Sequence, residues 1–200
     1  MNICIFGDSI AWGAYDPEQG GWTTRLRNYL EKKNKDINVY NLSISGDTTS
    51  ELFKRLEIEL QSRDPNIVVF AIGINDAKSI HSANTAHILL DEFKNNLNKL
   101  HKIANKFADK IAFVGLTPVD ESKTNPISWN MGISYENKNI KNFDDVINKF
   151  CEENGAEFIP VDKIININDL DDGLHPNTEG HKKIFNKVRP EIETLLQSNK

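Results

Sequence analysis

The sequence predicts an α/β protein in which helices cover both faces of a five-stranded parallel sheet. Short apolar segments alternate along the chain with longer segments whose apolar residues recur every three or four positions, as in strands followed by helices. Residues 67–72 are apolar throughout, as expected for a strand buried on both faces. The 200 residues, 38% of them hydrophobic, contain no repeat or linker, so we expect one domain spanning residues 1–200.

Five segments have the pattern and the boundaries of strands. The expected strands cover residues 3–6, 37–40, 67–72, 111–116 and 158–161. The first ends at Gly7-Asp8 and the fourth at Thr117-Pro118, and these residue types are typical of turns. The fifth contains Pro160, which cannot donate a hydrogen bond to a neighbouring strand, so we expect this strand at an edge of the sheet.

Five other segments place apolar residues on one face of a helix. The expected helices cover about residues 22–30, 52–60, 88–107, 140–150 and 177–195. Pro190 lies inside the last one, where it should kink or restart the helix. The segment from Thr117 to about Tyr135 shows no regular pattern, and an irregular loop of this length is usually functional or mobile.

Composition and charge argue against several classes of protein. The net charge is −5 at pH 7, which disfavours a broad surface for nucleic acid or for an anionic membrane. No apolar run approaches the ~20 residues of a membrane-spanning helix. Residues 1–8 lack a basic region and resemble a first strand more than a secretion signal. Cys4 and Cys151 lie in separate apolar segments, so we expect buried free thiols in a cytoplasmic protein with no stable membrane insertion.

Small and polar residues follow the ends of the predicted strands. In an open parallel sheet, ligands bind beyond the carboxyl ends of the strands. The segments at those ends are Gly7-Asp8-Ser9-Ile10, Ser45-Gly46-Asp47, Gly73-Ile74-Asn75-Asp76 and, after a further loop, Asp172-Gly173-Leu174-His175-Pro176. Although these segments span most of the chain, we expect them to meet at one edge of the sheet.

Their residue types meet the needs of an acyl-transfer site. Ser9 directly follows a strand and can act as the nucleophile. His175 can take its proton, because a neutral imidazole has a reference pKa of ~6.5. Asp172 lies three residues before His175 and can hold the ring N–H within one turn. The backbone N–H groups of Ser9 and Gly46 and the amide of Asn75 can together stabilise an oxyanion.

In these four segments, with the second extended to residues 41–48, the sequence resembles the SGNH hydrolases, also called GDSL-type esterases and lipases. That family is named for Ser, Gly, Asn and His in four blocks, which occur here in the family's order over residues 7–176. The resemblance implies the same roles for the five residues just named, and a flavodoxin-like three-layer sandwich with strand order 2-1-3-4-5. Two positions depart from the family pattern. Ile10 replaces the Leu of the GDSL name, a volume-conserving change, and Ser43 replaces a Gly common in the second block.

We therefore predict a carboxylic ester hydrolase that works through an acyl-enzyme, without a metal ion or cofactor. Its expected partner is a small-molecule ester with a small or polar acyl group, an acetyl ester or a lysophospholipid-like ester. Trp12 and Tyr15 flank the nucleophile and can line its pocket. Trp129 and Met131 can cover the substrate or can pack their loop down. The sequence does not indicate an oligomeric state.

Two alternatives of similar fold stay open. Asp8, Asp47 and Asp76 follow strand ends and can in principle hold Mg²⁺ in a receiver-like phosphotransfer domain. That class does not need the pair Asp172 and His175, and it usually carries paired acids after the first strand. A catalytically inactive binding module is the second alternative. In an esterase the three acids are structural: Asp8 fixes the turn around the nucleophile, and Asp47 caps the following helix or supports its own loop.

Overall fold

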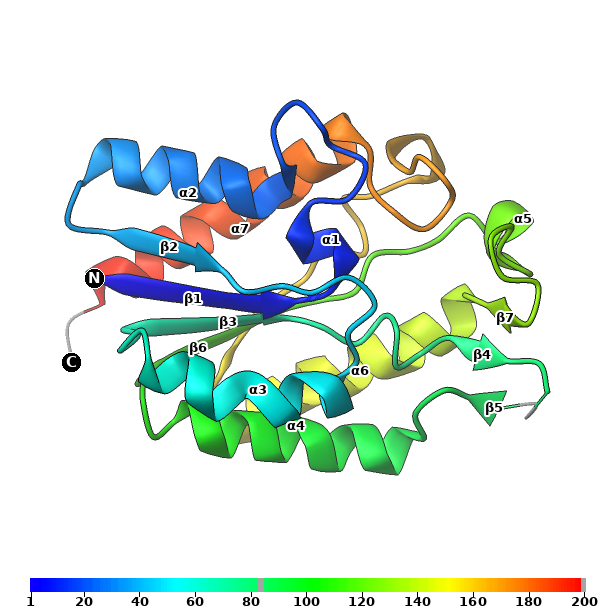
Figure 1. Ribbon diagram of the computed structural model, residues 1–200, viewed down its shortest axis with the longest axis horizontal. Coiled ribbons are helices and arrows are strands. Elements are labelled where there is room, and N and C mark those ends of the chain that lie inside the picture. Colours follow the sequence, from blue (N-terminus) through cyan, green and yellow to red (C-terminus); the bar gives the residue numbers. More distant parts are fainter. Residues whose placement is uncertain (83–84, 199–200) are drawn as a thin grey trace.

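The computed structural model, which describes residues 1–82 and 85–198, is built around a parallel sheet of five strands (Figure 1). These are β1 (Asn2–Gly7), β2 (Asn38–Asn41), β3 (Ile67–Ala71), β6 (Lys110–Val114) and β8 (Glu157–Ile159). Their order is β2-β1-β3-β6-β8. Because β4, β5 and β7 belong to another sheet, this is the expected order 2-1-3-4-5. β8 is an edge strand, as the adjacent Pro160 predicts.

Helices cover both faces of this sheet, which gives three layers (Figure 1). The helices on one face are α2 (Gly21–Lys33) and α7 (Thr178–Gln197). Those on the other face are α3 (Thr49–Gln61), α4 (Leu90–Ala104) and α6 (Asn137–Asn154). Each of them contains one of the apolar stripes seen in the sequence, and burial of such a stripe is what stabilises a helix of this length.

Pro190 does not restart the last helix. Of the two predicted effects, a kink or a restart, the restart is wrong, because α7 continues through Pro190 from Thr178 to Gln197. Ile184, Val188 and Ile192 are all at most 1% exposed and lie on both sides of the proline. Their shared burial outweighs the one backbone hydrogen bond that a proline removes.

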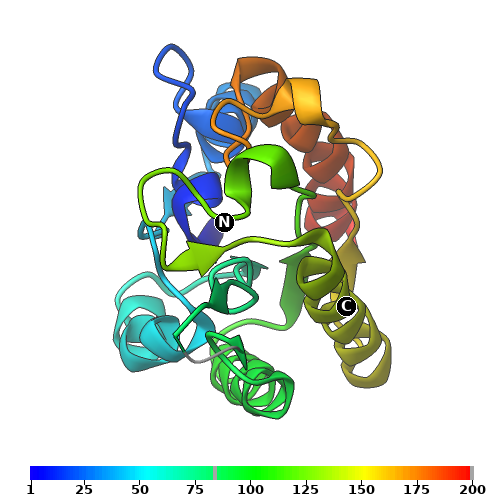
Figure 2. The same ribbon diagram turned by 90° about the vertical axis from the view of Figure 1, so that its right-hand side faces the viewer.

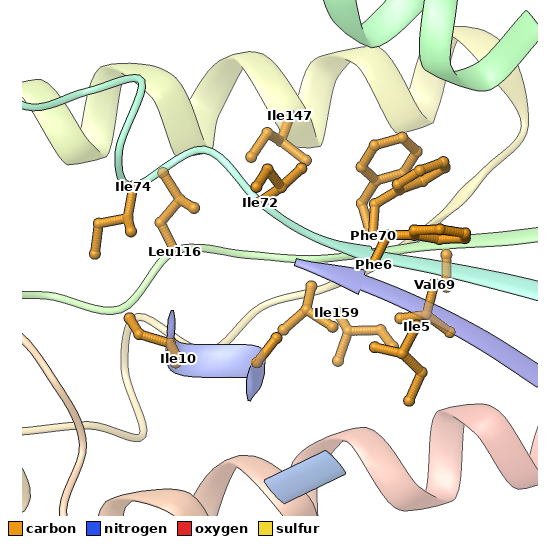
Figure 3. Packing of buried hydrophobic residues seen from close by; sticks show 14 of the residues in the cluster. Ile5, Phe6, Ile10, Val69, Phe70, Ile72, Ile74, Leu116, Ile147 and Ile159 are labelled. Carbon is orange, nitrogen blue, oxygen red and sulfur yellow. The ribbon is translucent and has the colours of Figure 1, made fainter. Parts of the chain in front are cut away.

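The core is continuous across the strands and fixes their relative positions. Phe6, Phe70 and Phe113 come from three neighbouring strands, with ring centroids 6.0 Å and 4.9 Å apart in sequence order. Figure 3 shows the first two packed together beside Ile72 and Ile147. Fully burying one such side chain contributes roughly 1.5–3 kcal/mol. This packing holds the strands at fixed positions relative to one another. The residues that follow their carboxyl ends are therefore also held at fixed relative positions.

The segment 117–135 is more ordered than its sequence indicates. It contains α5 (Glu121–Thr124) and β7 (Ile133–Ser134), and β7 pairs with β4 (Ser79–Ile80). With β5 (Thr85–Ala86) these strands form a three-stranded antiparallel sheet, order β5-β4-β7, beyond the carboxyl ends of the main sheet (Figures 1 and 2). The sequence missed it because two-residue strands are too short to show a period.

Two short helices also lie among the loops at this edge: α1 (Ser9–Trp12) and the 3₁₀ helix η1 (Ile167–Asp169). Cys4 and Cys151 are buried free thiols, as expected, and burial raises the pKa of each to about 12. Within residues 1–82 and 85–198, no helix is both long and apolar enough to cross a membrane.

Candidate active site

Ser9 begins α1 immediately after β1, at the carboxyl edge of the sheet. The carboxylate of Asp8 accepts a hydrogen bond from the backbone N–H of Ile10 at 3.0 Å, so it fixes this turn as predicted. A Cβ on Gly7 would lie 2.5 Å from the carbonyl oxygen of Ala71. The close approach of β1 and β3 just before the serine therefore requires glycine.

Ser9, His175 and Asp172 form a hydrogen-bonded chain. Oγ of Ser9 lies 2.9 Å from Nε2 of His175, and Nδ1 of His175 lies 2.8 Å from Oδ2 of Asp172. Oδ1 of Asp172 also accepts the backbone N–H groups of Leu174 and His175 at 2.9 Å and 2.8 Å. An ionised carboxylate that accepts Nδ1–H leaves Nε2 free to accept the serine proton.

The pKa of Asp172 shows that its carboxyl group is ionised. Burial by itself raises this pKa, but hydrogen bonds from the side chain and backbone of His175, and from the backbone of Leu174, outweigh burial and hold the pKa well below its usual range. A carboxyl group with this pKa carries its negative charge across the neutral range. It can therefore orient the imidazole and stabilise the imidazolium that forms when His175 takes a proton.

The loop that carries Asp172 and His175 is closed on itself and braced by the segment before α5. The backbone N–H of Asp171 donates to the carbonyl of His175 at 2.8 Å, and the N–H of Asp120 donates to the carbonyl of Gly173 at 2.8 Å. Gly173 has φ +92°, and a Cβ there would lie 2.7 Å from Cβ of Lys123. Figure 2 shows this loop next to α5. The backbone that carries the ring of His175 is thus held by a hydrogen bond within its own loop and by another to the segment before α5.

Gly46 and Asn75 lie next to one another beside the end of β1. The backbone N–H of Ile44 donates to the carbonyl of Gly7 at 3.0 Å, which ties the Gly46 loop to β1. Nδ2 of Asn75 donates to the carbonyl of Asp47 at 3.1 Å. Gly46 has φ +86° with nothing within 4 Å of an added Cβ, so the conformation and not the space favours glycine. The structure thus brings all five predicted residues to one edge.

Asp47 does not cap the following helix. Thr48 caps α3, and its backbone N–H donates to the carboxylate of Glu51 at 3.2 Å in a capping box. The carboxylate of Asp47 instead pairs with the guanidinium of Arg55 at 2.7 Å. Of the two roles predicted for Asp47, the helix cap is wrong, because Nε and Nη2 of Arg55, two turns into α3, both donate to Oδ2 of Asp47. Support of its own loop is confirmed, since Arg55 also donates to the carbonyl of Leu42 at 2.8 Å and so ties both ends of that loop to α3.

The three acids at the strand ends each have a different protein partner. Asp8 holds the turn at Ser9, Asp47 pairs with Arg55, and Asp76 accepts the backbone N–H of Thr49 at 3.1 Å. Burial raises the pKa of Asp8 to about 7 and that of Asp76 to about 6. In the part of the chain that the structure describes, no group of three or more His, Cys, Asp or Glu side chains could hold a metal ion. Each of the three carboxyl groups thus has a structural partner within the protein.

Two tyrosines contact the predicted site residues. The ring of Tyr15 stacks on that of His175, with centroids 5.0 Å apart and an interplanar angle of 23°. The hydroxyl of Tyr135 donates to Oδ1 of Asn75 at 2.9 Å. The sequence pointed to Tyr15 only through its proximity to the nucleophile. It gave no signal for Tyr135, which joins Asn75 across 60 residues.

The three predicted substrate-contacting residues are exposed. Trp12, at the end of α1, is 56% exposed, and Trp129 and Met131, between α5 and β7, are 55% and 67% exposed. The last two therefore do not pack their loop down. Ile127 and Ile133, at 0% and 8% exposure, do so. All three residues stay candidates for contact with a substrate.

Comparison with known proteins identifies the family. The model of the family described as GDSL-like Lipase/Acylhydrolase matches residues 3–188. The chain belongs to this family. An arylesterase of Vibrio mimicus is 25% identical over 195 residues, which cover 96% of this chain and 88% of that protein. Esterase TesA of Pseudomonas aeruginosa is 23% identical over 201 residues, which cover 98% and 90%. As a GDSL acylhydrolase, the protein is a carboxylic ester hydrolase.

Solved structures share the fold of this GDSL acylhydrolase. The acetylxylan esterase Axe2 from Geobacillus stearothermophilus matches with a TM-score of 0.75 and 20% identity, covering 96% of this chain and 93% of that one. LAE5, an alpha/beta hydrolase enzyme from the metagenome of Lake Arreo, matches with a TM-score of 0.76 and 18% identity, covering 97% and 95%. At these identities the likeness concerns the fold alone.

Proposed function

We propose that this GDSL acylhydrolase cleaves esters through an acyl-enzyme on Ser9, with His175 as general base and Asp172 as its orienting acid. The observation that carries the proposal is the unbroken chain of hydrogen bonds from Ser9 Oγ to His175 at 2.9 Å and from His175 to Asp172 at 2.8 Å. A base within hydrogen-bond distance of a hydroxyl, and itself held by a carboxylate, is the geometry that nucleophilic catalysis needs.

In the first half of the reaction, Oγ of Ser9 attacks the ester carbonyl carbon while its proton moves to Nε2 of His175. The carbonyl oxygen becomes an oxyanion, which accepts hydrogen bonds from the backbone N–H groups of Ser9 and Gly46 and from the amide of Asn75. When the C–O bond to the alcohol breaks, His175 gives the proton to the leaving oxygen, and the acyl group stays on Ser9.

Water reverses these steps in the second half. His175 takes a proton from the attacking water, the same donors hold the second oxyanion, and the bond from the acyl carbon to Oγ breaks. The proton returns to Ser9 as the carboxylic acid leaves. Asp172 stays ionised throughout because its pKa is low. Its negative charge therefore stabilises the imidazolium of His175 in both halves of the cycle.

For the substrate we propose a small or polar ester, such as an acetyl ester. Trp12, Trp129 and Met131 are the exposed apolar side chains that we propose as its contacts. The name acetylxylan esterase among the similar structures supports an acetyl group. A hydrophobic core that is continuous from Ile3 to Ile192 supports residues 1–200 acting as one domain, and the buried thiols support the cytoplasm as its compartment.

The test is hydrolysis of p-nitrophenyl acetate by the wild type and by Ser9→Ala. We expect the wild type to turn over this ester and the variant to release p-nitrophenol at the uncatalysed rate, with an unchanged circular dichroism spectrum. Comparable rates in the two proteins would refute the assignment of the nucleophile. A panel of p-nitrophenyl esters of increasing chain length, with acetylated sugars, would identify the acyl group. A wild type that is inactive on the whole panel would favour the inactive binding module.

A further inference from the structure

The side chain of Asn75 is held by two buried hydrogen bonds. Its Oδ1 accepts the hydroxyl of Tyr135 at 2.9 Å, and its Nδ2 donates to the carbonyl oxygen of Asp47 at 3.1 Å. Asn75 is 5% exposed and Tyr135 is 1% exposed. An amide nitrogen carries two hydrogens. One of them is used by Asp47, and the other has no acceptor among residues 1–82 and 85–198, so it can donate to a substrate oxygen.

Both contacts select the same orientation of the amide. Rotating the Asn75 amide by 180° would place Oδ1 against the carbonyl oxygen of Asp47, and two acceptors repel each other. The same rotation would take away the acceptor of the Tyr135 hydroxyl, and a buried donor without an acceptor is costly. Tyr135 and Asp47 therefore act together to keep Nδ2, and not Oδ1, on the side of the Gly46 loop.

Tyr135 is itself fixed independently of Asn75. Its backbone N–H donates to the carbonyl of Thr124 at 3.0 Å, and the hydroxyl of Thr124 donates to the carbonyl of Tyr135 at 2.7 Å. The preceding strand β7 pairs with β4, which closely follows Asn75 in the chain. The backbone of Tyr135 is thus held in place by its hydrogen bonds with Thr124 and by the pairing of β7 with β4. Such a rigid support keeps a site within the narrow geometry that catalysis needs.

The environment of Tyr135 keeps its hydroxyl protonated. Burial raises the pKa of this phenol above its ordinary value, and the negative charges of Asp8 and Asp172 raise it further. The hydroxyl therefore remains a donor at neutral pH.

We propose that Tyr135 is a positioning residue for the oxyanion site, which orients and polarises the amide of Asn75 without touching the substrate. The proposal rests on the proposed function, since it assigns the free hydrogen of Asn75 Nδ2 to the oxyanion. A donor on the amide oxygen withdraws electron density from the amide nitrogen, which makes its N–H a stronger donor. The stronger N–H donor stabilises the substrate oxygen most when that oxygen carries a negative charge, as it does in the transition state.

The first measurement is kcat and KM for p-nitrophenyl acetate in Tyr135→Phe, which removes only the hydroxyl. We expect kcat to fall about three- to tenfold with KM nearly unchanged, because the lost interaction acts in the transition state. Tyr29→Phe is the matched control. Its hydroxyl donates to Glu193 at 3.1 Å between α2 and α7, and we expect wild-type kinetics. An unchanged kcat in Tyr135→Phe would overturn the proposal.

The decisive measurement is a double-mutant cycle with Asn75→Ala, which by itself should lower kcat by about 10²–10³. If Tyr135 acts through Asn75, adding Tyr135→Phe to Asn75→Ala will have no further effect on kcat. A destabilised or poorly folded variant lowers kcat in both backgrounds. An equal fall in the two backgrounds would therefore show a merely structural role and contradict the proposal. Thermal unfolding of all four proteins reports any loss of folded enzyme.

Ser9→Ala, measured in the same series, separates this proposal from the one on which it rests. If Ser9→Ala retains wild-type activity, the proposed function itself has failed, whatever Tyr135→Phe does. If Ser9→Ala is inactive and the cycle shows no coupling between Tyr135 and Asn75, only the positioning role is overturned. Inactive Ser9→Ala together with full coupling supports both.

Discussion

The hydroxyl oxygen of Ser9 lies 2.9 Å from Nε2 of His175, although 166 residues separate them in the chain. β1 is an interior strand of the sheet, and Ser9 follows it at the carboxyl edge. The loop before α7 brings His175 back to the same edge. α7 packs against α2, which follows the α1 turn. The meeting of these two side chains is thus a consequence of the layered topology.

Replacing Asp172 by Asn should lower kcat by about 10³–10⁴ without unfolding the protein. The amide cannot stabilise the imidazolium, and it favours the wrong tautomer of His175. The control is Asp171→Asn, an exposed neighbour outside the hydrogen-bonded chain, which should change kcat less than twofold. Steady-state kinetics on p-nitrophenyl acetate provide the test. Similar losses in the two variants would mean that negative charge in the loop, and not the contact with His175, supports catalysis.

Gly46→Ala should lower kcat, whereas its loss in the free energy of unfolding should be no larger than that of a matched glycine outside the site. Gly46 has φ +86° with open space around an added Cβ, and Gly155, at the end of α6, has φ +68° with the same open space. Alanine in this conformation costs about 1–2 kcal/mol at either position. Only at Gly46 does relief of that strain turn a backbone N–H away from the oxyanion, so we expect kcat to fall about tenfold or more there.

Urea unfolding and kinetics of Gly46→Ala and Gly155→Ala, side by side, check this. Gly155→Ala should show the same loss in the free energy of unfolding with wild-type kcat. Gly46→Ala with wild-type kcat would remove Gly46 from the set of oxyanion donors.

Asp8 should make the protein less stable as the pH rises. Burial raises its pKa from 3.8 to about 7, so between those values the folded state binds more protons than the unfolded chain. The contribution of Asp8 to the free energy of unfolding is fully present below about pH 4, and it is lost as the pH rises through about 7. Asp8→Asn, which cannot ionise, should therefore lose less stability than the wild type between pH 4 and 8.

Urea unfolding at several pH values measures this difference. Asp36→Asn, an exposed carboxyl replacement, should follow the pH dependence of the wild type. A parallel course for wild type and Asp8→Asn would show that Asp8 does not carry the effect.

Prolonged dialysis against EDTA should leave the hydrolysis of p-nitrophenyl acetate unchanged. The proposed mechanism supplies the nucleophile, the base and the oxyanion donors from the chain itself, so no step needs a metal ion. The measurement compares kcat before dialysis, after it, and after addition of Mg²⁺ or Zn²⁺. A loss of activity that one of these ions restores would favour a metal-dependent reaction and contradict the proposal.

The sequence predicted the elements whose signals are local. The apolar run at 67–72 and the turn residues at Gly7-Asp8 are readable because burial and backbone conformation act on neighbouring residues. The order of the five main strands, implied by the family resemblance, is confirmed. The competition of Arg55 for Asp47 and the continuity of α7 through Pro190 were not readable, because each depends on packing partners elsewhere in the chain.

The residue types around Ser9 and His175, and their position after strand ends, were determined by the sequence alone, since a strand and its turn are encoded by consecutive residues. Only the tertiary structure decided which side chains support them: Tyr15 against the imidazole and Tyr135 on the amide of Asn75. Such contacts join segments that have no common period or spacing. They follow from how helices and strands pack, which no single stretch of residues encodes.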